Sequence, residues 1–182
     1  MLHRAGLSLL VAGIAAGGVL VGLASPASAV TVSNEAELRA AFATETQIDV
    51  QADIVLTDCT GGGAVERTAA VTDPVTVDGH GHTVLQTCAD NVFLQDGSGL
   101  FTVQNLTITG GHASGNGGGI FAAGPLTLQS TTIYGNRANA AGGGIASQGL
   151  ITMTSSTVDL AAASRSGISV LRLTAGACSQ KI

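Results

Sequence analysis

Apolar and polar residues alternate in three short stretches of the chain, and these stretches recur at a fixed distance. Apolar pairs two positions apart begin at Phe101, Leu126 and Ile151, each 25 residues after the previous one. The run Gly117–Ile120 recurs in the same register as Gly142–Ile145. Alternation sends every second side chain to one face of a strand. A repeat of this length, in short strands broken by glycine, predicts a stacked solenoid.

The repeat length alone also fits a leucine-rich repeat, which carries a leucine ladder, an asparagine and a helical or turn segment. Here β-branched Thr, Val and Ile dominate the repeats, and glycine occurs in runs that a helix would not tolerate. We therefore predict an all-β fold, a short right-handed parallel β-helix of about 25-residue coils over residues 47–160.

Two short motifs carry a resemblance to a known group of proteins. The segments Gly117–Ile120 and Ile133–Asn136 resemble the Gly-Gly-x-Ile and x-x-x-Asn pattern of polymorphic outer membrane protein repeats and of secreted bacterial right-handed β-helix proteins. The resemblance covers about residues 75–160 and implies the pectate lyase-like superfold. That scaffold hosts pectin-degrading enzymes, adhesins and surface proteins, so the resemblance implies no single function.

Residues 1–29 have the pattern of a secretory signal peptide. A basic start at His3 and Arg4 precedes the apolar run Leu7–Leu23, and Ala27–Ala29 is a small-x-small cleavage site. The alternative is an uncleaved membrane anchor, because the apolar run approaches the length that spans a bilayer. We expect a bacterial protein that is secreted or held at the cell surface, with no membrane span after cleavage.

Residues 30–46 are predicted to cap the first coil with an amphipathic helix over Thr31–Phe42. Asn34 can cap this helix while Glu37 reaches back in a capping box. Its apolar face comprises Leu38, Ala41 and Phe42. A solenoid exposes the apolar cross-section of its first coil unless another element covers it, so the helix is expected to be a cap.

Two other segments depart from the repeat. Cys59–Thr72 contains three consecutive glycines and the charged pair Glu66 and Arg67, and is expected to be a loop projecting from a coil. Residues 161–182 lack the turn asparagine, although Gly167 and Val170 stand where a further unit would want glycine and an apolar residue. This segment is either a degenerate last coil or a truncated tail. An uncapped strand edge there would pair with another chain, such as a second copy.

Three cysteines follow the predicted cleavage site, and we predict a disulfide between Cys59 and Cys88. Closing a loop of about 30 residues stabilises the fold by roughly 3 to 4 kcal/mol in the chain-entropy model. Cys178 is then free or pairs between chains. No C-x-x-C spacing indicates a metal site.

The distribution of charge narrows the classes of partner. The chain carries a net charge of −5, which becomes −6 when Arg4 leaves with the signal peptide, so nucleic acid is not an expected partner. Eleven of the twelve acids lie at or before Asp96, and the repeats carry Thr, Ser, Asn and Gln instead. Aromatic residues make up 3% of the chain, without Trp, so the stacked-ring platform of many sugar-binding surfaces is missing.

The turn Gly79–Gly81 resembles a short motif of polygalacturonases, which hydrolyse pectin with paired carboxylates. The Asp-Asp, Asn-Thr-Asp and Arg-x-Lys motifs of that family are absent. We therefore assign no catalytic residue and expect His80 and His82 to be exposed turn residues. The polar and acidic surface candidates are Asp78, His80, His82, Asp90 and Asp96.

Pectate lyases, on the same scaffold, bind Ca²⁺ through acidic side chains on one face. Ca²⁺ needs six to eight oxygen ligands, yet no carboxylate occurs between Gly97 and Val158. We expect no metal or cofactor, with Ca²⁺ held by the acids of the first coils as the alternative. Within the repeats, Asn105, Ser130 and Ser155 share one position and are expected to form a hydrogen-bonded polar ladder, and Asn136 to be a left-handed turn residue.

Two functional hypotheses follow. The first is an exported, non-catalytic β-helix protein that acts in surface association, with itself, an extracellular polysaccharide or a cell-surface component as partner. The second is a polysaccharide lyase or hydrolase, or a remnant of one. An enzyme would need carboxylates converging on one face, so the placement of Asp78, Asp90 and Asp96 distinguishes the two hypotheses.

Overall fold

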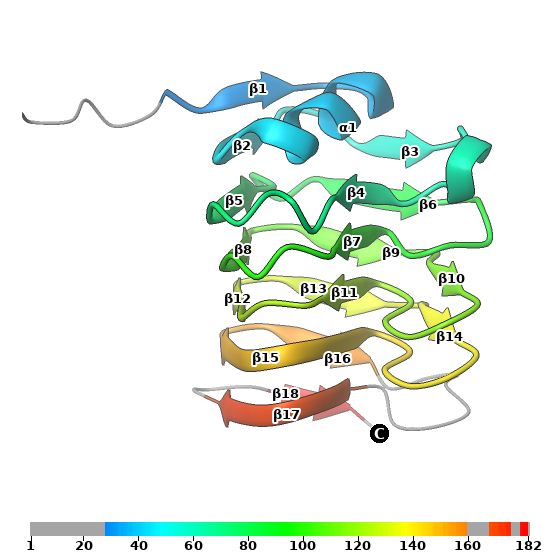
Figure 1. Cartoon of the computed structure of the whole chain (residues 1–182), viewed down its shortest axis with the longest axis vertical. Coiled ribbons are helices and arrows are strands. Elements are labelled where there is room, and N and C mark those ends of the chain that lie inside the picture. The colour runs from blue at the N-terminus through cyan, green and yellow to red at the C-terminus, as the bar shows by residue number, and fades with distance from the viewer. Residues whose placement is uncertain (1–27, 160–167, 176–178, 182) are drawn as a thin grey trace, which may run out of the picture.

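The computed structural model describes residues 28–159, 168–175 and 179–181, with side chains described to residue 159. The strands stack in parallel turns along one axis (Figure 1), with β1 and α1 at one end and β17 and β18 at the other. This arrangement confirms the predicted parallel β-solenoid. The predicted signal peptide, apart from its last two residues, and Cys178 lie outside the described residues.

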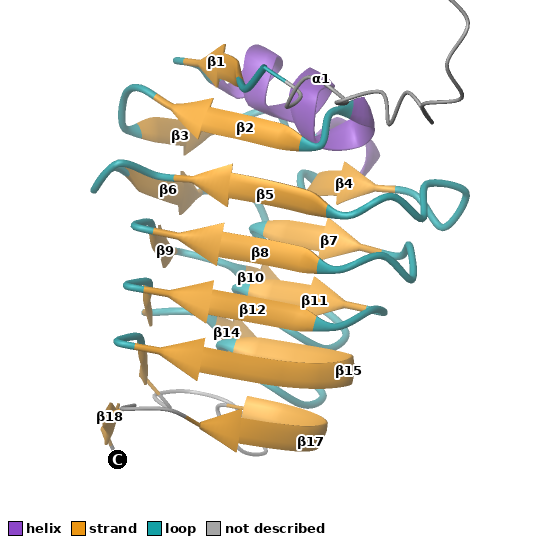
Figure 2. Cartoon of the chain, turned by 90° about the vertical axis from the view of Figure 1, so that its left-hand side faces the viewer, coloured by secondary structure: helices purple, strands orange, loops and turns teal. Residues whose placement is uncertain are grey.

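Three faces surround the core. On the first face, seen in Figure 2, the strands are β1 (Val30–Val32), β2 (Gln47–Val50), β5 (Val75–Asp78), β8 (Phe101–Gln104), β12 (Leu126–Gln129) and the second half of β15 (Ile145–Thr154). The second face contains β3 (Ile54–Leu56), β6 (Thr83–Gln86), β9 (Thr107–Thr109), β13 (Thr132–Tyr134), β16 (Thr157–Asp159) and β18 (Ser179–Lys181). The third consists of β4 (Val65–Arg67), β7 (Phe93–Gln95), β11 (Ile120–Ala122) and the first half of β15.

The smaller elements lie at the corners and ends of the stack. β10 (His112–Ala113) pairs with β14 (Arg137–Ala138) between the second and third faces, and the short helix η1 (Thr60–Gly62) lies between β3 and β4. β17 (Ile168–Ala175) runs along β15. Four full turns therefore run from β2 to the first half of β15.

The register confirms the 25-residue period in the middle of the stack and shows where it changes. Leu126 pairs with Phe101 and with Ile151, as the apolar pattern predicts. Earlier, Ile48 pairs with Val77, 29 residues on, because the turn between them includes the η1 corner. Strand lengths stay nearly constant, so the corners absorb the difference in length.

The core is a set of apolar columns closed at the N-terminal end by aromatic packing. Every second strand residue, such as Val103, is buried. Phe42 of α1 lies 5.2 Å from the ring of Phe93 and 5.1 Å from that of Phe101, and these two rings are 5.7 Å apart. Tilted ring pairs at such distances are favourable beyond the area they bury. The helix thus covers the apolar cross-section of the stack.

The predicted cap helix is confirmed as α1 (Glu35–Thr44), with Asn34 as its N-cap as predicted, so the helix does not extend back to Thr31. The Asn34 side chain accepts the backbone N–H of Glu37, and the Glu37 carboxylate accepts the N–H of Ser33, one residue before the position we expected. Val30–Val32 is strand β1 instead of helix, because its β-branched residues pair in parallel with β2.

The expectation that Glu66 and Arg67 lie in a projecting loop is wrong. Both are in strand β4, where Glu66 faces outward and Arg67 is completely buried. The Arg67 guanidinium donates to the carbonyl oxygens of Phe42 (2.7 Å) and Glu45 (3.0 Å) at the C-terminal end of α1. Helix ends leave carbonyls without partners and carry a partial negative charge. The arginine therefore satisfies the end of the cap helix from inside the stack.

Asn136 is not a left-handed turn residue: the positive φ belongs to Gly135, at 63°. The Asn136 side chain is buried, accepts the backbone N–H of Gly111 (2.8 Å) and donates to the carbonyl of Ile108 (3.0 Å). Both partners belong to the preceding turn. Asn136 therefore ties two turns together from within the core, where unsatisfied backbone groups would be costly.

The predicted disulfide is confirmed. Cys59 and Cys88 occupy equivalent corners of adjacent turns, with their Cα atoms 5.4 Å apart. Arg39 of α1 donates to the backbone carbonyls of Asp58 (3.0 Å) and Gly63 (2.6 Å) on either side of η1. The disulfide and the arginine together hold the longest corner against the cap helix and the next turn.

Beyond residue 160, the backbone of β17 pairs with β15 and that of β18 with β16, as the degenerate-coil alternative expects. The register differs from our expectation. Ile168 lies opposite Ile145, whereas a 25-residue period would place Val170 there. Ile151 then pairs with Leu173, so this part of the stack has shorter turns than the middle.

Candidate functional site

One corner of the stack, between the first and second faces, repeats the same unusual backbone conformation in four successive turns. The residues that adopt it, which we call the corner column, are His80, Asn105, Ser130 and Ser155, with φ of 47°, 51°, 49° and 51°. The predicted alignment of Asn105, Ser130 and Ser155 is thus confirmed. Counting 25 residues back from Asn105 would also have found His80.

The expected hydrogen bonds along this ladder are absent from the described part of the chain, where no side chain of the corner column bonds to the next. Instead the backbones are linked: the N–H of Asn105 donates to Gln129 and that of Ser130 to Thr154. These two N–H groups therefore link each of the two middle turns to the turn that follows. The column is therefore stabilised by the backbone, and its side chains face outward.

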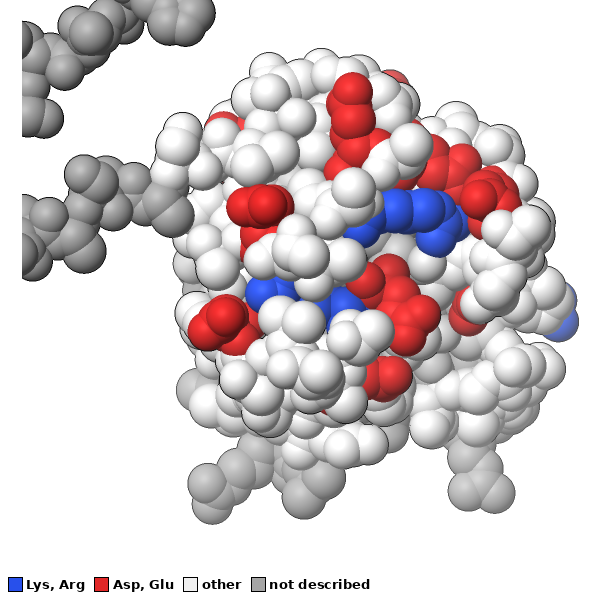
Figure 3. Space-filling view, turned by 45° about the horizontal axis from the view of Figure 1, so that its top comes forward, with Lys and Arg blue, Asp and Glu red and all other residues white. Residues whose placement is uncertain are grey.

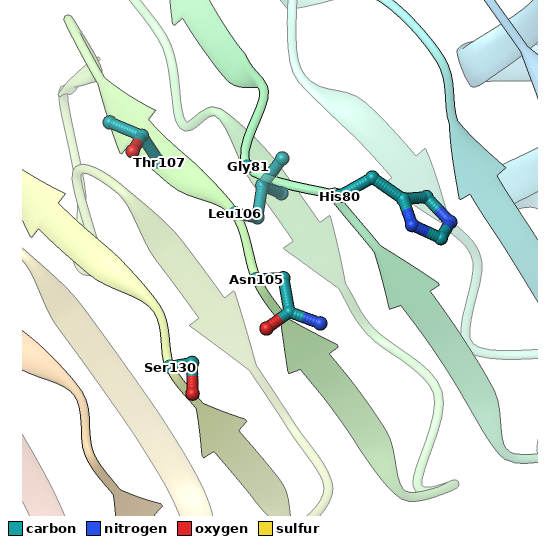
Figure 4. Close-up of a pocket in the computed structure, with 6 residues that line it drawn as sticks. All are labelled: His80, Gly81, Asn105, Leu106, Thr107 and Ser130. Carbon is teal, nitrogen blue, oxygen red and sulfur yellow. The ribbon is translucent and has the colours of Figure 1, made fainter.

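An open groove of about 410 Å³ lies along the first three residues of the corner column. Its lining comprises His80, Gly81, Asn105, Leu106, Thr107 and Ser130 (Figure 4). The groove crosses the ends of β5, β8 and β12 and the start of β9. No Lys, Arg, Asp or Glu is among these lining residues. The groove thus offers imidazole, amide and hydroxyl groups to a ligand.

Asp78 lies at the N-terminal end of this groove as an acceptor of hydrogen bonds. Its carboxylate accepts the backbone N–H of His80 (3.0 Å), the amide of Asn105 (3.1 Å) and that of Gln104 (2.9 Å). Burial acts to raise the pKa of Asp78, but these hydrogen bonds and the nearby His80 outweigh it and hold the pKa below its ordinary value. Asp78 is thereby ionised at neutral pH and orients Asn105.

Both predicted histidines lie beside carboxylates of the preceding turn. His80 Nε2 is 3.5 Å from Asp49 Oδ1, and His82 Nδ1 is 3.3 Å from Asp53 Oδ1. Asp53 also accepts the backbone N–H of Thr83. Of the acids predicted together with the histidines, Asp78 does lie 3.9 Å from His80 Nδ1. Asp49 and Asp53 were not among them, because they are 29 to 31 residues from the histidines and become neighbours only through the longer first turn.

The other two predicted acids lie at different corners. Asp90 is between β6 and β7, where its carboxylate accepts the N–H of Asn91. Asp96 is exposed between β7 and β8, and its N–H donates to the carbonyl of Arg67. Asp78 at the end of β5, Asp90 after β6 and Asp96 after β7 therefore lie at three different corners and do not share one face.

The placement of the carboxylates determines whether this corner could act as a glycosidase or hold a metal ion. A glycosidase needs one carboxylic acid that is protonated at working pH, opposite a second carboxylate. Asp78 has the opposite property, because its pKa is lowered. Among residues 28–159 and the described parts of β17 and β18, no group of three or more His, Cys, Asp or Glu side chains is arranged to hold a metal ion.

Two columns of threonine, which the repeat alignment had shown only in part, flank the corner. On the first face Thr76, Thr102, Thr127 and Thr152 pair in register, and on the second face Thr83, Thr107, Thr132 and Thr157 do so. Figure 3 shows that carboxylates gather over the N-terminal end of the stack, while much of the surface in that view is uncharged. At the corner itself, Asp49, Asp53 and Asp78 lie beside the histidines of the early turns, whereas the column residues of the later turns are Ser130 and Ser155.

A comparison with protein-family models matches residues 29–164 to the family described as "Putative pectate lyase-like adhesive domain". The chain belongs to this family. The match covers the cap helix and all four full turns, and it supports an adhesive or binding role on a β-helix scaffold. No curated protein and no solved structure matches the chain. In the described part of the chain, no helix is long and apolar enough to cross a membrane.

Proposed function

We propose that this pectate lyase-like adhesive domain is an exported, non-catalytic protein that attaches to an extracellular polysaccharide or another cell-surface component. The family match carries this proposal, because the family is described as adhesive. The signal-peptide pattern of residues 1–29 and the likeness of the repeats to secreted bacterial β-helix proteins agree with it.

The corner geometry supports binding without catalysis. Asp78 is engaged by three hydrogen bonds and lacks the raised pKa of a general acid, while Asp90 and Asp96 lie at other corners. Neutral donors and acceptors that repeat from turn to turn can instead bind a repeating surface at several points. Such multiple attachment gives avidity even when each contact is weak.

The test is a retention assay on immobilised extracellular polymers, combined with an assay for products. The purified protein is applied to cellulose, mannan, polygalacturonate and collagen-coated beads, and the supernatants are analysed for reducing ends and unsaturated uronates. We expect retention on at least one polymer and no products. Product release would support the polysaccharide-active enzyme instead, and the absence of retention on every surface would contradict adhesion.

A further inference from the structure

The corner column contains side chains at positions where glycine would be less strained. An L-residue in the left-handed region is strained because its Cβ crowds the neighbouring carbonyl oxygen, whereas glycine has no Cβ. This chain has 26 glycines and places glycine at other left-handed positions, such as Gly110 (81°) and Gly135 (63°) at the following corner. Strain that persists in a polar, exposed side chain is a reason to look for a use of that side chain.

Among the described residues, only two of the four side chains in the corner column have polar contacts within the protein. The Asn105 amide donates to Asp78, and His80 lies beside Asp49. The hydroxyls of Ser130 and Ser155 are exposed and have no hydrogen-bond partner among the described residues. These two serines therefore contribute polar groups to the surface without a role in holding the turns together.

The surroundings of the column repeat with every turn. From Asn105 onward, each turn presents an amide or hydroxyl on the first face, the column residue, and a threonine on the second face. The first-face residues are Gln104, Gln129 and Thr154, and the threonines are Thr107, Thr132 and Thr157. Parallel strands lie about 4.8 Å apart, so the set recurs at that interval along the stack.

We infer that the corner groove binds an extended, uncharged polysaccharide that lies along the stack, with one sugar residue per turn. This inference deepens the proposed adhesive function and rests on it. The residues of an extended β-linked chain advance by a distance close to the spacing of the turns, so each sugar meets the same amide and hydroxyl groups. The threonine methyl groups provide apolar contact for the C–H faces of the sugars, and Tyr134, 47% exposed, adds one aromatic ring beside the threonine column.

Charge selects neutral sugars over uronates. No Lys or Arg is among the residues that line the groove, and the carboxylates of Asp49, Asp53 and Asp78 lie at its N-terminal end. An anionic polymer lying along the groove would meet these like charges without a compensating arginine or lysine. The structure therefore favours a cellulose-like or mannan-like chain over polygalacturonate as the occupant of the groove.

The experiment compares two pairs of exposed serines in the full chain. The variant Ser130→Gly/Ser155→Gly removes two hydroxyls of the column, and glycine relieves the strain, so its stability should equal or exceed that of the parent. The matched control Ser98→Gly/Ser114→Gly removes two exposed serines at other corners. Binding is measured by depletion on cellulose, mannan and polygalacturonate, with urea unfolding of each variant.

We expect the parent protein to bind cellulose or mannan at least about tenfold more tightly than polygalacturonate. The column variant should bind at least about tenfold more weakly than the parent, which corresponds to two lost hydrogen bonds, while the control remains unchanged. Soluble β-1,4-linked oligosaccharides should compete more strongly with length up to about four residues, the number of column positions, and no further.

Four outcomes overturn the inference while leaving the adhesive function intact. Three of them are preference for polygalacturonate, retention only on collagen, and neutral-glycan binding that the column variant does not weaken. An equal loss of binding in the column variant and in the control variant also overturns the inference, because the serines of the column would then contribute no more than other exposed serines. Absence of retention on every surface would contradict the adhesive function as well, so the two failures are distinguishable.

Discussion

At the residue scale, Arg67 shows how a charged side chain can serve a solenoid core. The guanidinium is completely buried, yet it meets the carbonyls of Phe42 and Glu45 where the cap helix ends. Burial lowers the pKa of Arg67, and the charges of Asp73 and Glu45 act in the opposite direction. The guanidinium holds several N–H donors in a fixed plane and can donate to two carbonyl oxygens at once. The ammonium group of a lysine does not have this fixed geometry.

We predict that Arg67→Ala lowers the free energy of unfolding by about 3 kcal/mol, because two buried carbonyls lose their donor and a cavity remains. Urea unfolding followed by circular dichroism measures the change. Arg137→Ala, which removes an exposed arginine from β14, should change stability by no more than about 0.5 kcal/mol. A similar small effect at Arg67 would contradict the assigned role.

The sequence could not have predicted the buried polar residues, because their partners are backbone groups of other turns. Arg67 follows three glycines within a few residues and is next to Glu66, a local pattern typical of an exposed loop. Asn136 follows a glycine at a repeated turn position. Only the stacking decides that both side chains point inward, toward α1 and toward Gly111. The column at 105, 130 and 155 was predictable because the repeat alone places it.

At the element scale, the cap helix is attached to the first turn through Glu35. Its carboxylate accepts the N–H groups of Thr57 (2.8 Å) and Asp58 (3.0 Å) and pairs with Arg39 (2.8 Å). Burial acts to raise the pKa of Glu35, but the hydrogen bonds from Thr57, Arg39 and Asp58 outweigh it and hold the pKa below its ordinary value.

This lowered pKa predicts how stability depends on pH. The folded protein binds a proton at Glu35 more weakly than the unfolded chain does, so the stabilisation is present above about pH 4.5 and is lost as pH falls through the folded pKa. Glu35→Gln should therefore be less stable than the parent at pH 7 and lose less stability on acidification. Urea unfolding between pH 7 and pH 3 tests this. Glu66→Gln, at an exposed site on β4, serves as control and should follow the parent.

The disulfide acts on a different element, the corner that contains η1. Cysteines 59 and 88 are 29 residues apart, and closing a loop of that size stabilises by roughly 3 to 4 kcal/mol. The double variant Cys59→Ser/Cys88→Ser should lose about this much in guanidinium unfolding. Reduction of the parent should cause a similar loss. An unchanged midpoint in both experiments would show that Arg39 alone holds this corner.

Element boundaries show the limits of the repeat as a predictor. The strands from Phe101 to Met153 were predictable because two consecutive turns have the same length. The first turn includes the η1 corner, and β17 follows β15 at a shorter interval, so a fixed period misplaces both ends of the stack. Strand β1 was missed because it is only three residues long and directly precedes the capping box, so its alternation of apolar and polar residues is too short to recognise.

At the scale of the whole molecule, the two ends differ. The N-terminal end is covered by α1 and carries most of the carboxylates (Figure 3), whereas the last strands of the described residues are β17 and β18. Arg172 and Lys181 belong to these strands. Strand edges pair readily with other strands. The sequence of these last strands is basic, so a second copy whose N-terminal end carries carboxylates is a suitable partner by charge.

We therefore predict that the protein self-associates in a salt-dependent way. Light scattering at low ionic strength should give a mass above that of a monomer. Added salt should lower this mass, because at 0.1 M salt the attraction between surface charges more than about 10 Å apart is largely screened. Parallel measurements with reductant show whether Cys178 links the copies. A monomeric mass at every protein and salt concentration would contradict association through this end.

The constant corner geometry has a consequence for how such a protein can change in evolution. Because consecutive middle turns have the same length and pair in the same register, tandem duplication of one 25-residue segment would insert a complete turn without disturbing its neighbours. The new turn would bring one more column residue and one more threonine pair. The reach of the adhesive surface along a polymer can thus lengthen in discrete steps through a simple copying error in the gene.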